Sequence, residues 1–270
     1  MNHLSTCTWA CVSHVGNIRK NNEDSMVMLS VGEDGADELP DKGSSEISSR
    51  GYIAVVADGM GGVQGGELAS SILRESILEL AGGSTCPNPE EEPLRNIVDE
   101  ANFRILRKTD ADPSLAGMGT TLTLCWLKGN ELTLANVGDS RVYRLRNNTL
   151  EQLSKDQSPV GRLLREGRIT IEESRTHPHR NVIDQAVGSH PEGLDPEIAS
   201  FEMADGDLYL LCSDGLNEEL WDHEITEVLL DALQTKQPLI SAAEKLVSNT
   251  LLAGGKDNVT VILLKVGIPS

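Results

Sequence analysis

Residues 52–62 read YIAVVADGMGG, and this stretch decides the fold. Its first six residues form a fully apolar run that stops at Asp58, as a short buried strand does. The glycine-rich turn leads into residues 68–80, where Leu and Ile side chains recur at helical spacing. The stretch therefore predicts a buried strand that ends at a carboxylate and is followed by a helix.

The rest of the chain contains further runs of both kinds. Strand-like runs occupy residues 6–15, 25–31, 120–127, 131–137, 142–145, 208–212 and 259–266, and helical patterns occupy residues 94–105, 225–232 and 240–251. Short turns join several strands, which predicts antiparallel hairpins. Because the helices come in pairs instead of alternating with strands, the expected class is α+β: an antiparallel β-sandwich flanked by pairs of α-helices, in four αββα layers.

One domain is expected over residues 1–270. A chain of 270 residues can bury a substantial single core, and no internal repeat or linker divides it. Residues 32–51 are rich in Gly, Ser, Asp and Glu and lack apolar periodicity. We therefore expect this segment to be an inserted acidic loop on the surface.

The composition excludes several classes of function. The formal net charge of −19, without a Lys/Arg-rich run, opposes binding to nucleic acid or to an anionic membrane. The five cysteines form no CxxC pair and no cluster with the six histidines, which argues against a zinc ribbon and favours a reducing, cytoplasmic location. No export signal is expected, and no stretch reaches the ~18 apolar residues of a membrane span.

Four aspartates share one local setting, the end of a predicted strand: Asp58, Asp139, Asp214 and Asp257. Three of them have Gly or Ser neighbours, which let a carbonyl or a water approach a cation closely. Any one of them alone is also compatible with an ordinary turn. Their recurrence, without clustered His or Cys, indicates an octahedral Mg²⁺ or Mn²⁺ site with oxygen ligands. The turn NNED adds two further candidates, Glu23 and Asp24.

Two other kinds of site fit the sequence poorly. In DGMGGVQGG, residues 58–66, Gln64 stands where a dinucleotide fingerprint requires its third glycine, and no GK[ST] follows. A calcium-binding structural protein would show a DxDxDG loop with a glutamate at its twelfth position, and this sequence has none.

Seven motifs follow one another along nearly the whole chain. They are GNIRKNNED (16–24), VVADGMGG (55–62), GMGTTLT (117–123), ANVGDSR (135–141), HPHRNVIDQAVG (177–188), LLCSDGL (210–216) and GGKDNVTVILL (254–264). In content and order they resemble the metal-dependent protein phosphatases of type 2C, in their bacterial form. The resemblance implies a monomeric enzyme that hydrolyses phosphoserine and phosphothreonine in proteins and opposes a cognate Ser/Thr kinase.

The same resemblance implies a role for each candidate residue. Asp58 would bridge two Mg²⁺ or Mn²⁺ ions. Its companions would be the Gly59 carbonyl and Glu23 or Asp24 on one side, and Asp214 and Asp257 on the other. Asp139, with help from Asp214, resembles the residue that holds a third, weaker ion, and Arg19 resembles the arginine that receives the phosphate. The catalytic set would then be Arg19, Asp58 and Asp214.

Elementary chemistry supports these roles. An arginine fork binds two phosphate oxygens at once, which a lysine cannot copy, so Arg19 is favoured over Lys20. Two cations about 3.5–4 Å apart lower the pKa of a shared water and aim it at phosphorus, so no protein nucleophile is required. The alternative is a catalytically inactive binding or regulatory module of the same family, because folds can outlive their chemistry. The complete ligand set argues against it.

Two features leave alternatives open. Many family members have a histidine where this chain has Met60, and that histidine is thought to protonate the leaving group; His14, His177 and a metal-bound water are alternatives here. Residues 159–180 correspond to the flap of the family and carry five arginines against three glutamates. This patch either steers acidic phosphopeptides toward the metals or is a solvated surface.

Overall fold

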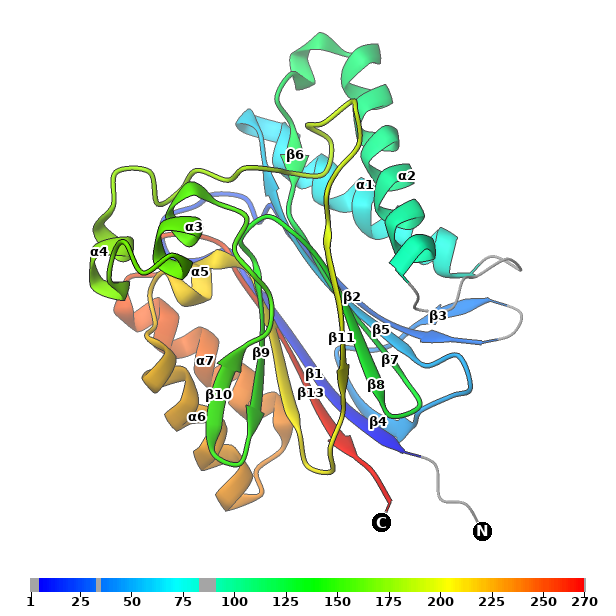
Figure 1. The fold of residues 1–270 in the computed structure, drawn as a ribbon, viewed down its shortest axis with the longest axis vertical. Coiled ribbons are helices and arrows are strands. Elements are labelled where there is room, and N and C mark those ends of the chain that lie inside the picture. The colour runs from blue at the N-terminus through cyan, green and yellow to red at the C-terminus, as the bar shows by residue number, and fades with distance from the viewer. Residues whose placement is uncertain (1–4, 33–34, 83–90, 270) are drawn as a thin grey trace.

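The computed structural model describes residues 5–32, 35–82 and 91–269, in which two antiparallel sheets pack face to face (Figure 1). The first sheet consists, from edge to edge, of β10 (Thr149–Gln152), β9 (Arg141–Arg146), β12 (Leu208–Cys212), β13 (Val259–Gly267), β1 (Thr6–His14) and β4 (Lys42–Glu46). The second consists of β11 (Glu197–Glu202), β8 (Glu131–Val137), β7 (Leu122–Lys128), β5 (Tyr52–Met60), β2 (Asp24–Val31) and β3 (Ala36–Glu38), and the two-residue β6 (Gly119–Thr120) pairs with β5.

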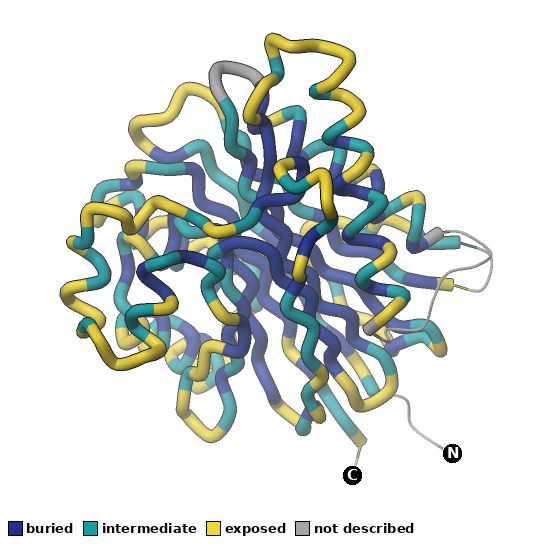
Figure 2. The backbone as a smooth tube through the Cα atoms, turned by 45° about the horizontal axis from the view of Figure 1, so that its top comes forward, coloured by how far each residue is buried: buried dark blue, intermediate teal, exposed yellow. Residues whose placement is uncertain are grey.

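A pair of helices covers the outer face of each sheet (Figure 1). The pair α1 (Gly62–Gly82) and α2 (Glu91–Ala111) packs on the second sheet, and the pair α6 (Asp222–Thr235) and α7 (Leu239–Ala253) packs on the first. Three apolar layers result, one between the sheets and one under each helix pair, so buried backbone fills the centre (Figure 2). The predicted α+β sandwich with flanking helix pairs is confirmed.

The central strand β5 explains why the second sheet holds together. It pairs with β2 on one side and β7 on the other, and Tyr52 to Ala57 are all buried. The apolar run of the sequence is therefore a strand buried on both faces. The register with β2 places Asp24 opposite Asp58, so two carboxylates meet at the same end of the sheet.

The prediction of a loop over residues 32–51 is wrong for much of that segment. β3 pairs with β2 in the second sheet, and β4 pairs with β1 in the first, so the segment crosses one edge of the sandwich. The Trp9 indole donates a hydrogen bond to the Pro40 carbonyl at 2.8 Å. The side chains of β3 and β4 are mostly exposed, so backbone pairing forms these strands without the apolar alternation by which strands are recognised.

The region between β10 and β12 contains two short helices and the strand β11. The flap forms α3 (Pro159–Arg165) and α4 (Ile171–Thr176). Ser158 caps α3, and Thr170 and Glu173 form a capping box on α4. In the part of the chain that the structure describes, no helix has the length and apolar character needed to cross a bilayer.

Candidate metal centre

The predicted site residues meet at one end of the sandwich, where strands of both sheets end. A cavity of about 560 Å³ lies there, and Arg19 lines it. Six of the seven predicted metal ligands line it too: Glu23, Asp58, Gly59, Asp139, Asp214 and Asp257. The structure thus brings together residues that are up to 238 positions apart along the chain, which is the separation of Arg19 and Asp257.

Both sheets contribute to this cavity. Asp58 comes from β5 of the second sheet. Asp214, at the start of the short helix α5 (Asp214–Asn217), and Asp257, before β13, come from the first sheet. Asp139 lies in the turn where the chain passes from β8 in one sheet to β9 in the other. The carboxylates therefore converge because several strand ends of a sandwich share one edge.

Two threonines hold the backbone of Asp58. The Asp58 N–H donates to Thr121 Oγ1 at 2.9 Å, and the Asp58 carbonyl accepts from the Thr120 hydroxyl at 2.9 Å. The Thr121 hydroxyl also hydrogen-bonds to Ser140, beside Asp139, at 2.8 Å. The sequence reasoning assigned no role to these hydroxyls. Their signal was the TT pair in the motif GMGTTLT, whose position beside Asp58 depends on the pairing of β6 with β5.

The structure separates the two candidates Glu23 and Asp24. Glu23 lines the cavity, and its N–H donates to Asn258 Oδ1 at 2.8 Å. Asp24 is buried behind the cavity, where its Oδ2 accepts from the Ser213 hydroxyl at 2.7 Å. Ser213 precedes Asp214, so Asp24 is placed to support that segment. Glu23 is the residue of this pair that faces the cavity.

Gly59 lies where three backbone segments come close together. A Cβ at this position would lie 2.2 Å from the Gly66 carbonyl oxygen and 2.5 Å from the Glu23 carbonyl oxygen. The Gly59 N–H donates to the same Glu23 carbonyl at 3.2 Å. Only glycine therefore allows β5 to pass this close to the turn before β2 and to the start of α1.

Arg19 is held at the cavity by a carboxylate. Its Nη2 lies 2.6 Å from Asp257 Oδ2, and half of the Arg19 side chain is exposed. The Asn258 side-chain amide donates to the carbonyls of Val15 and Asn21, both at 2.9 Å. The segment DN of the last motif thereby fixes the turn that carries Arg19.

The carboxyls in and behind the cavity raise one another's pKa values. For Asp58, burial and then the charges of Asp214, Asp24 and Asp139 raise the pKa well above its usual value. Burial and then Asp139 do the same to the pKa of Asp214. Burial raises the pKa of Asp139 to about 7 and that of Asp24 to about 6. A cation bound between these carboxyls would stabilise their ionised forms.

The donor set fits hard divalent cations. The groups in the cavity that could bind an ion, four aspartates, Glu23 and the Gly59 carbonyl, all present oxygen atoms. Among residues 5–32, 35–82 and 91–269, no three Asp, Glu, His or Cys side chains could hold an ion by themselves. Mg²⁺ and Mn²⁺ sites in which water completes the shell need only one or two carboxylates per ion, so this spacing suits them.

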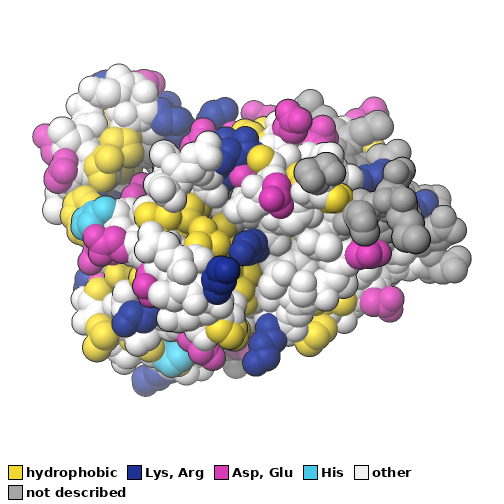
Figure 3. Space-filling model, turned by 90° about the horizontal axis from the view of Figure 1, so that it is seen from below, with side chains coloured by type: hydrophobic (Ala, Val, Ile, Leu, Met, Phe, Trp, Pro, Cys, Tyr) yellow, Lys and Arg dark blue, Asp and Glu magenta, His cyan; other side chains and the backbone are white. Residues whose placement is uncertain are grey.

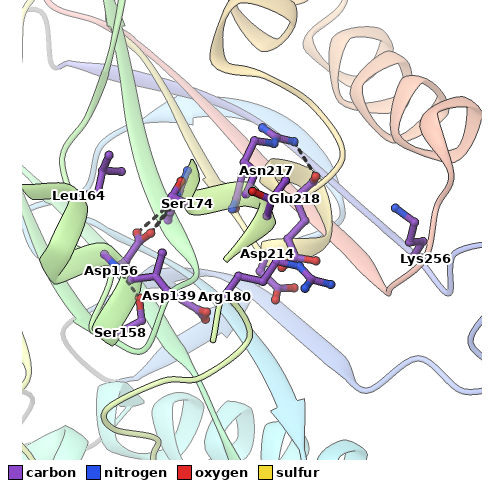
Figure 4. A pocket seen from close by; sticks show the side chains of 15 residues that line it. Asp139, Asp156, Ser158, Leu164, Ser174, Arg180, Asp214, Asn217, Glu218 and Lys256 are labelled. Atoms are coloured by element: carbon purple, nitrogen blue, oxygen red, sulfur yellow. Dashed lines mark hydrogen bonds and ion pairs between the residues drawn. The ribbon is translucent and has the colours of Figure 1, made fainter. Parts of the chain in front are cut away.

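A second cavity of about 400 Å³ adjoins the first, between the flap and α5 (Figure 4). Asp139 and Asp214 line both cavities. On the flap side, Asp156 binds the guanidinium of Arg141 with oxygen to nitrogen distances of 2.7–3.2 Å. Arg141 lies two residues after Asp139, so this pair connects the strand end to the base of the flap.

The histidines suggested as proton donors do not line the main cavity, whereas Met60 does. His14 Nδ1 accepts from the Gly16 N–H at 2.9 Å, and His177 Nδ1 accepts from the His179 N–H at 3.1 Å. Both rings are thus used to shape turns. Neither histidine is placed as the general acid.

Comparison with known proteins identifies the family to which the chain is similar. The family described as Protein phosphatase 2C matches residues 37–255. The chain is 36% identical over 265 residues to the serine/threonine protein phosphatase PstP of Mycobacterium tuberculosis, covering 96% of this chain but only 45% of that protein. It is also 36% identical over 217 residues to the serine/threonine phosphatase stp of Listeria welshimeri, covering 79% of this chain and 84% of the relative.

Solved structures show the same fold. The catalytic domain of PstP in complex with two manganese ions has a TM-score of 0.78 and 34% identity, with 97% of this chain and 99% of that chain covered. The serine/threonine phosphatase Stp1 of Staphylococcus aureus has a TM-score of 0.81 and 27% identity, with 98% and 97% covered. The chain described here therefore belongs to the protein phosphatase 2C family.

Proposed function

We propose that this chain is a metal-dependent phosphatase that hydrolyses phosphoserine and phosphothreonine in proteins. The observation that carries the proposal is the cavity in which Arg19 faces five carboxylates contributed by both sheets. Arginine pairs with a phosphate dianion, and the carboxylates fit divalent cations. Relatives that cover most of this chain are named serine/threonine phosphatases, which supports the same substrate class.

We assign two Mg²⁺ or Mn²⁺ ions to the cavity. Asp58 would contact both, with Glu23 and the Gly59 carbonyl on one side and Asp214 and Asp257 on the other. Asp139 is the residue for a third ion. When bound, the ions would supply an acidified water as nucleophile and neutralise charge on the phosphate. Asp24 would position Asp214 through its hydrogen bond with Ser213.

The protein's own part in the reaction is orientation. Half of the Arg19 side chain is exposed, so the guanidinium N–H groups that do not face Asp257 are available to a phosphate, while Asn258 fixes the turn that carries Arg19. Met60 cannot donate a proton to the leaving alkoxide, and neither His14 nor His177 lines the cavity. We assign that proton to water in the cavity. A cognate Ser/Thr kinase, a monomeric state and a cytoplasmic location remain predictions from the sequence.

The test is hydrolysis of a phosphothreonine peptide with Mn²⁺, with Mg²⁺ and with EDTA. We expect activity with either ion and none with EDTA. Asp58→Asn and Asp214→Asn should each lower kcat/KM by at least about 100-fold, because each substitution removes a carboxylate that would hold the ions and the water that they activate. Asp231→Asn, an exposed aspartate on α6, is the matched control and should keep full activity. Full activity in either cavity variant would refute the proposed site.

An inactive binding module predicts the opposite result. Such a protein would bind the phosphopeptide without releasing phosphate under any metal condition. Phosphate release by the unaltered chain, measured beside peptide binding, separates the two functions.

A further inference from the structure

The flap, residues 159–180, is basic in sequence, but most of its arginines already have partners within the protein. The partners are Asp184 for Arg162, the Asp156 carbonyl for Arg165, Glu166 for Arg168, and the Glu218 and Leu220 carbonyls for Arg175. Arg175 also stacks over the Trp221 ring at 4.1 Å. These contacts hold the flap to itself and to the body, so much of its charge is compensated locally.

The basic side chains near the metal centre also differ in whether they already have a partner within the protein. Arg19 pairs with Asp257, and Lys256 Nζ lies 3.1 Å from Glu219 Oε1. Lys20 lines the main cavity beside Arg19 and is exposed. Within the described ranges, the Lys20 side chain makes no ion pair or hydrogen bond with the protein. Its charge is therefore available to a molecule that enters the cavity.

The backbone that carries Lys20 is fixed on both sides. Before it, the Asn17 N–H donates to the Gly255 carbonyl at 2.7 Å, and the Asn17 side chain donates to Leu251 and Gly254 carbonyls at 2.8 and 3.0 Å. After it, the Asn21 carbonyl accepts from Asn258 at 2.9 Å. A fixed backbone with one uncommitted side chain is how a site discriminates between ligands without losing its shape.

We propose that Lys20 is a specificity-determining residue, which binds an acidic side chain of the substrate within two positions of the phosphorylated residue. The proposal rests on the function proposed above. Consecutive Cα atoms are about 3.8 Å apart, and an extended peptide advances about 3.3 Å per residue. With the phosphate at Arg19, Lys20 therefore lies opposite the residues next to the phosphorylated one.

Charge explains why one lysine matters here. The chain carries a formal net charge of −19, so an acidic peptide is repelled on approach. Figure 3 shows the end of the molecule away from the cavity, seen from below, and acidic and basic side chains are interspersed on that face. The ammonium group of Lys20 offsets this repulsion for peptides with a flanking Asp or Glu. For an exposed ion pair, the expected gain in kcat/KM is roughly 2- to 5-fold.

The experiment compares two phosphothreonine peptides that differ only in two flanking positions, Glu in one and Lys in the other. The readout is the ratio of their kcat/KM values, with p-nitrophenyl phosphate as a substrate without flanks. Lys20→Glu should lower the acidic-to-basic ratio by about 10-fold or more, mainly through KM, and Lys20→Met by a smaller factor. Lys245→Glu makes the same change in net charge on α7 and should leave the ratio unchanged.

The outcomes separate this inference from the function on which it rests. Hydrolysis of both peptides with the same ratio in Lys20→Glu and in the unaltered chain would overturn the role of Lys20 and leave the phosphatase intact. An equal shift in Lys245→Glu would also overturn it, because the effect would then come from net charge. No hydrolysis of any of the three substrates by the unaltered chain with Mn²⁺ would overturn the proposed function and this inference with it.

Discussion

At the scale of single residues, Asp139 shows how a buried carboxylate that would bind a cation affects the stability of the metal-free protein. Burial, followed by the charge of Asp156, raises the pKa of Asp139 to about 7. In the unfolded chain an aspartate has a pKa of about 3.9. The folded protein thus binds the proton more tightly. The stability from this group is complete below the unfolded pKa and is lost as the pH rises through about 7.

Asp139→Asn should therefore stabilise the metal-free protein near neutral pH. Asparagine keeps the size of the protonated aspartate and cannot ionise, so we expect a gain of roughly 1–3 kcal/mol at pH 7.5 that shrinks toward zero near pH 4. Urea unfolding in EDTA at both pH values measures it. Asp231→Asn should change little at either pH. A gain that is equal at both values would show that ionisation of Asp139 is not its cause.

Sequence patterns pointed one by one to the carboxylates that line the cavity, but not to how these are arranged around it. The strand-end position of Asp58, Asp214 and Asp257 is visible locally, because an apolar run stops at or begins beside each of them. The choice between Glu23 and Asp24 was not visible, since it depends on which side of the turn faces the cavity. The hydroxyl of Thr121 reaches Asp58 only through the pairing of strands distant in sequence.

At the scale of elements, the strands with a local sequence signal were predicted, and the strands that depend on tertiary pairing were missed. β5, β7, β12 and β13 were predicted because their side chains are buried and apolar. β3, β4 and β11 carry many exposed side chains, so periodicity cannot reveal them. What forms them is backbone pairing with a strand that is already present, and this depends on tertiary structure.

The contact of β4 with Trp9 tests whether that strand contributes to stability. A Cβ on Gly43 would lie 2.3 Å from Trp9 Cζ2, so Gly43→Ala should displace the indole from the Pro40 carbonyl. Overpacking of this kind costs about 1–3 kcal/mol, measurable by urea unfolding. In a Trp9→Phe background, which has a smaller ring and no indole donor, the same substitution should cost less. Additive losses in the double variant would contradict the steric explanation.

At the scale of the whole molecule, the metal centre lies where the two sheets share an edge. Asp58 belongs to the second sheet, and Asp214 and Asp257 belong to the first. Without a cation, burial and then the charge of Asp214 raise the pKa of Asp58, and burial and then the charge of Asp139 raise the pKa of Asp214. An ion held by ligands from both sheets would replace the repulsion between these charges with attraction. Metal binding should thus join the sheets at this end.

Amide hydrogen exchange with and without Mn²⁺ measures whether metal binding links the two sheets. Mn²⁺ at about 100 times its Kd should stabilise the folded protein by about 2.7 kcal/mol. Amides at Gly59 and at Asp214, one beside each sheet, should become slower to exchange together, whereas Asn147 and Asn148 in the β9–β10 hairpin should not respond. Asp58→Asn should remove the slowing at both amides, because the ligand shared by the two sheets is gone. If Mn²⁺ still slowed the exchange of either the Gly59 or the Asp214 amide in that variant, the ions would not be acting as a bridge between the sheets.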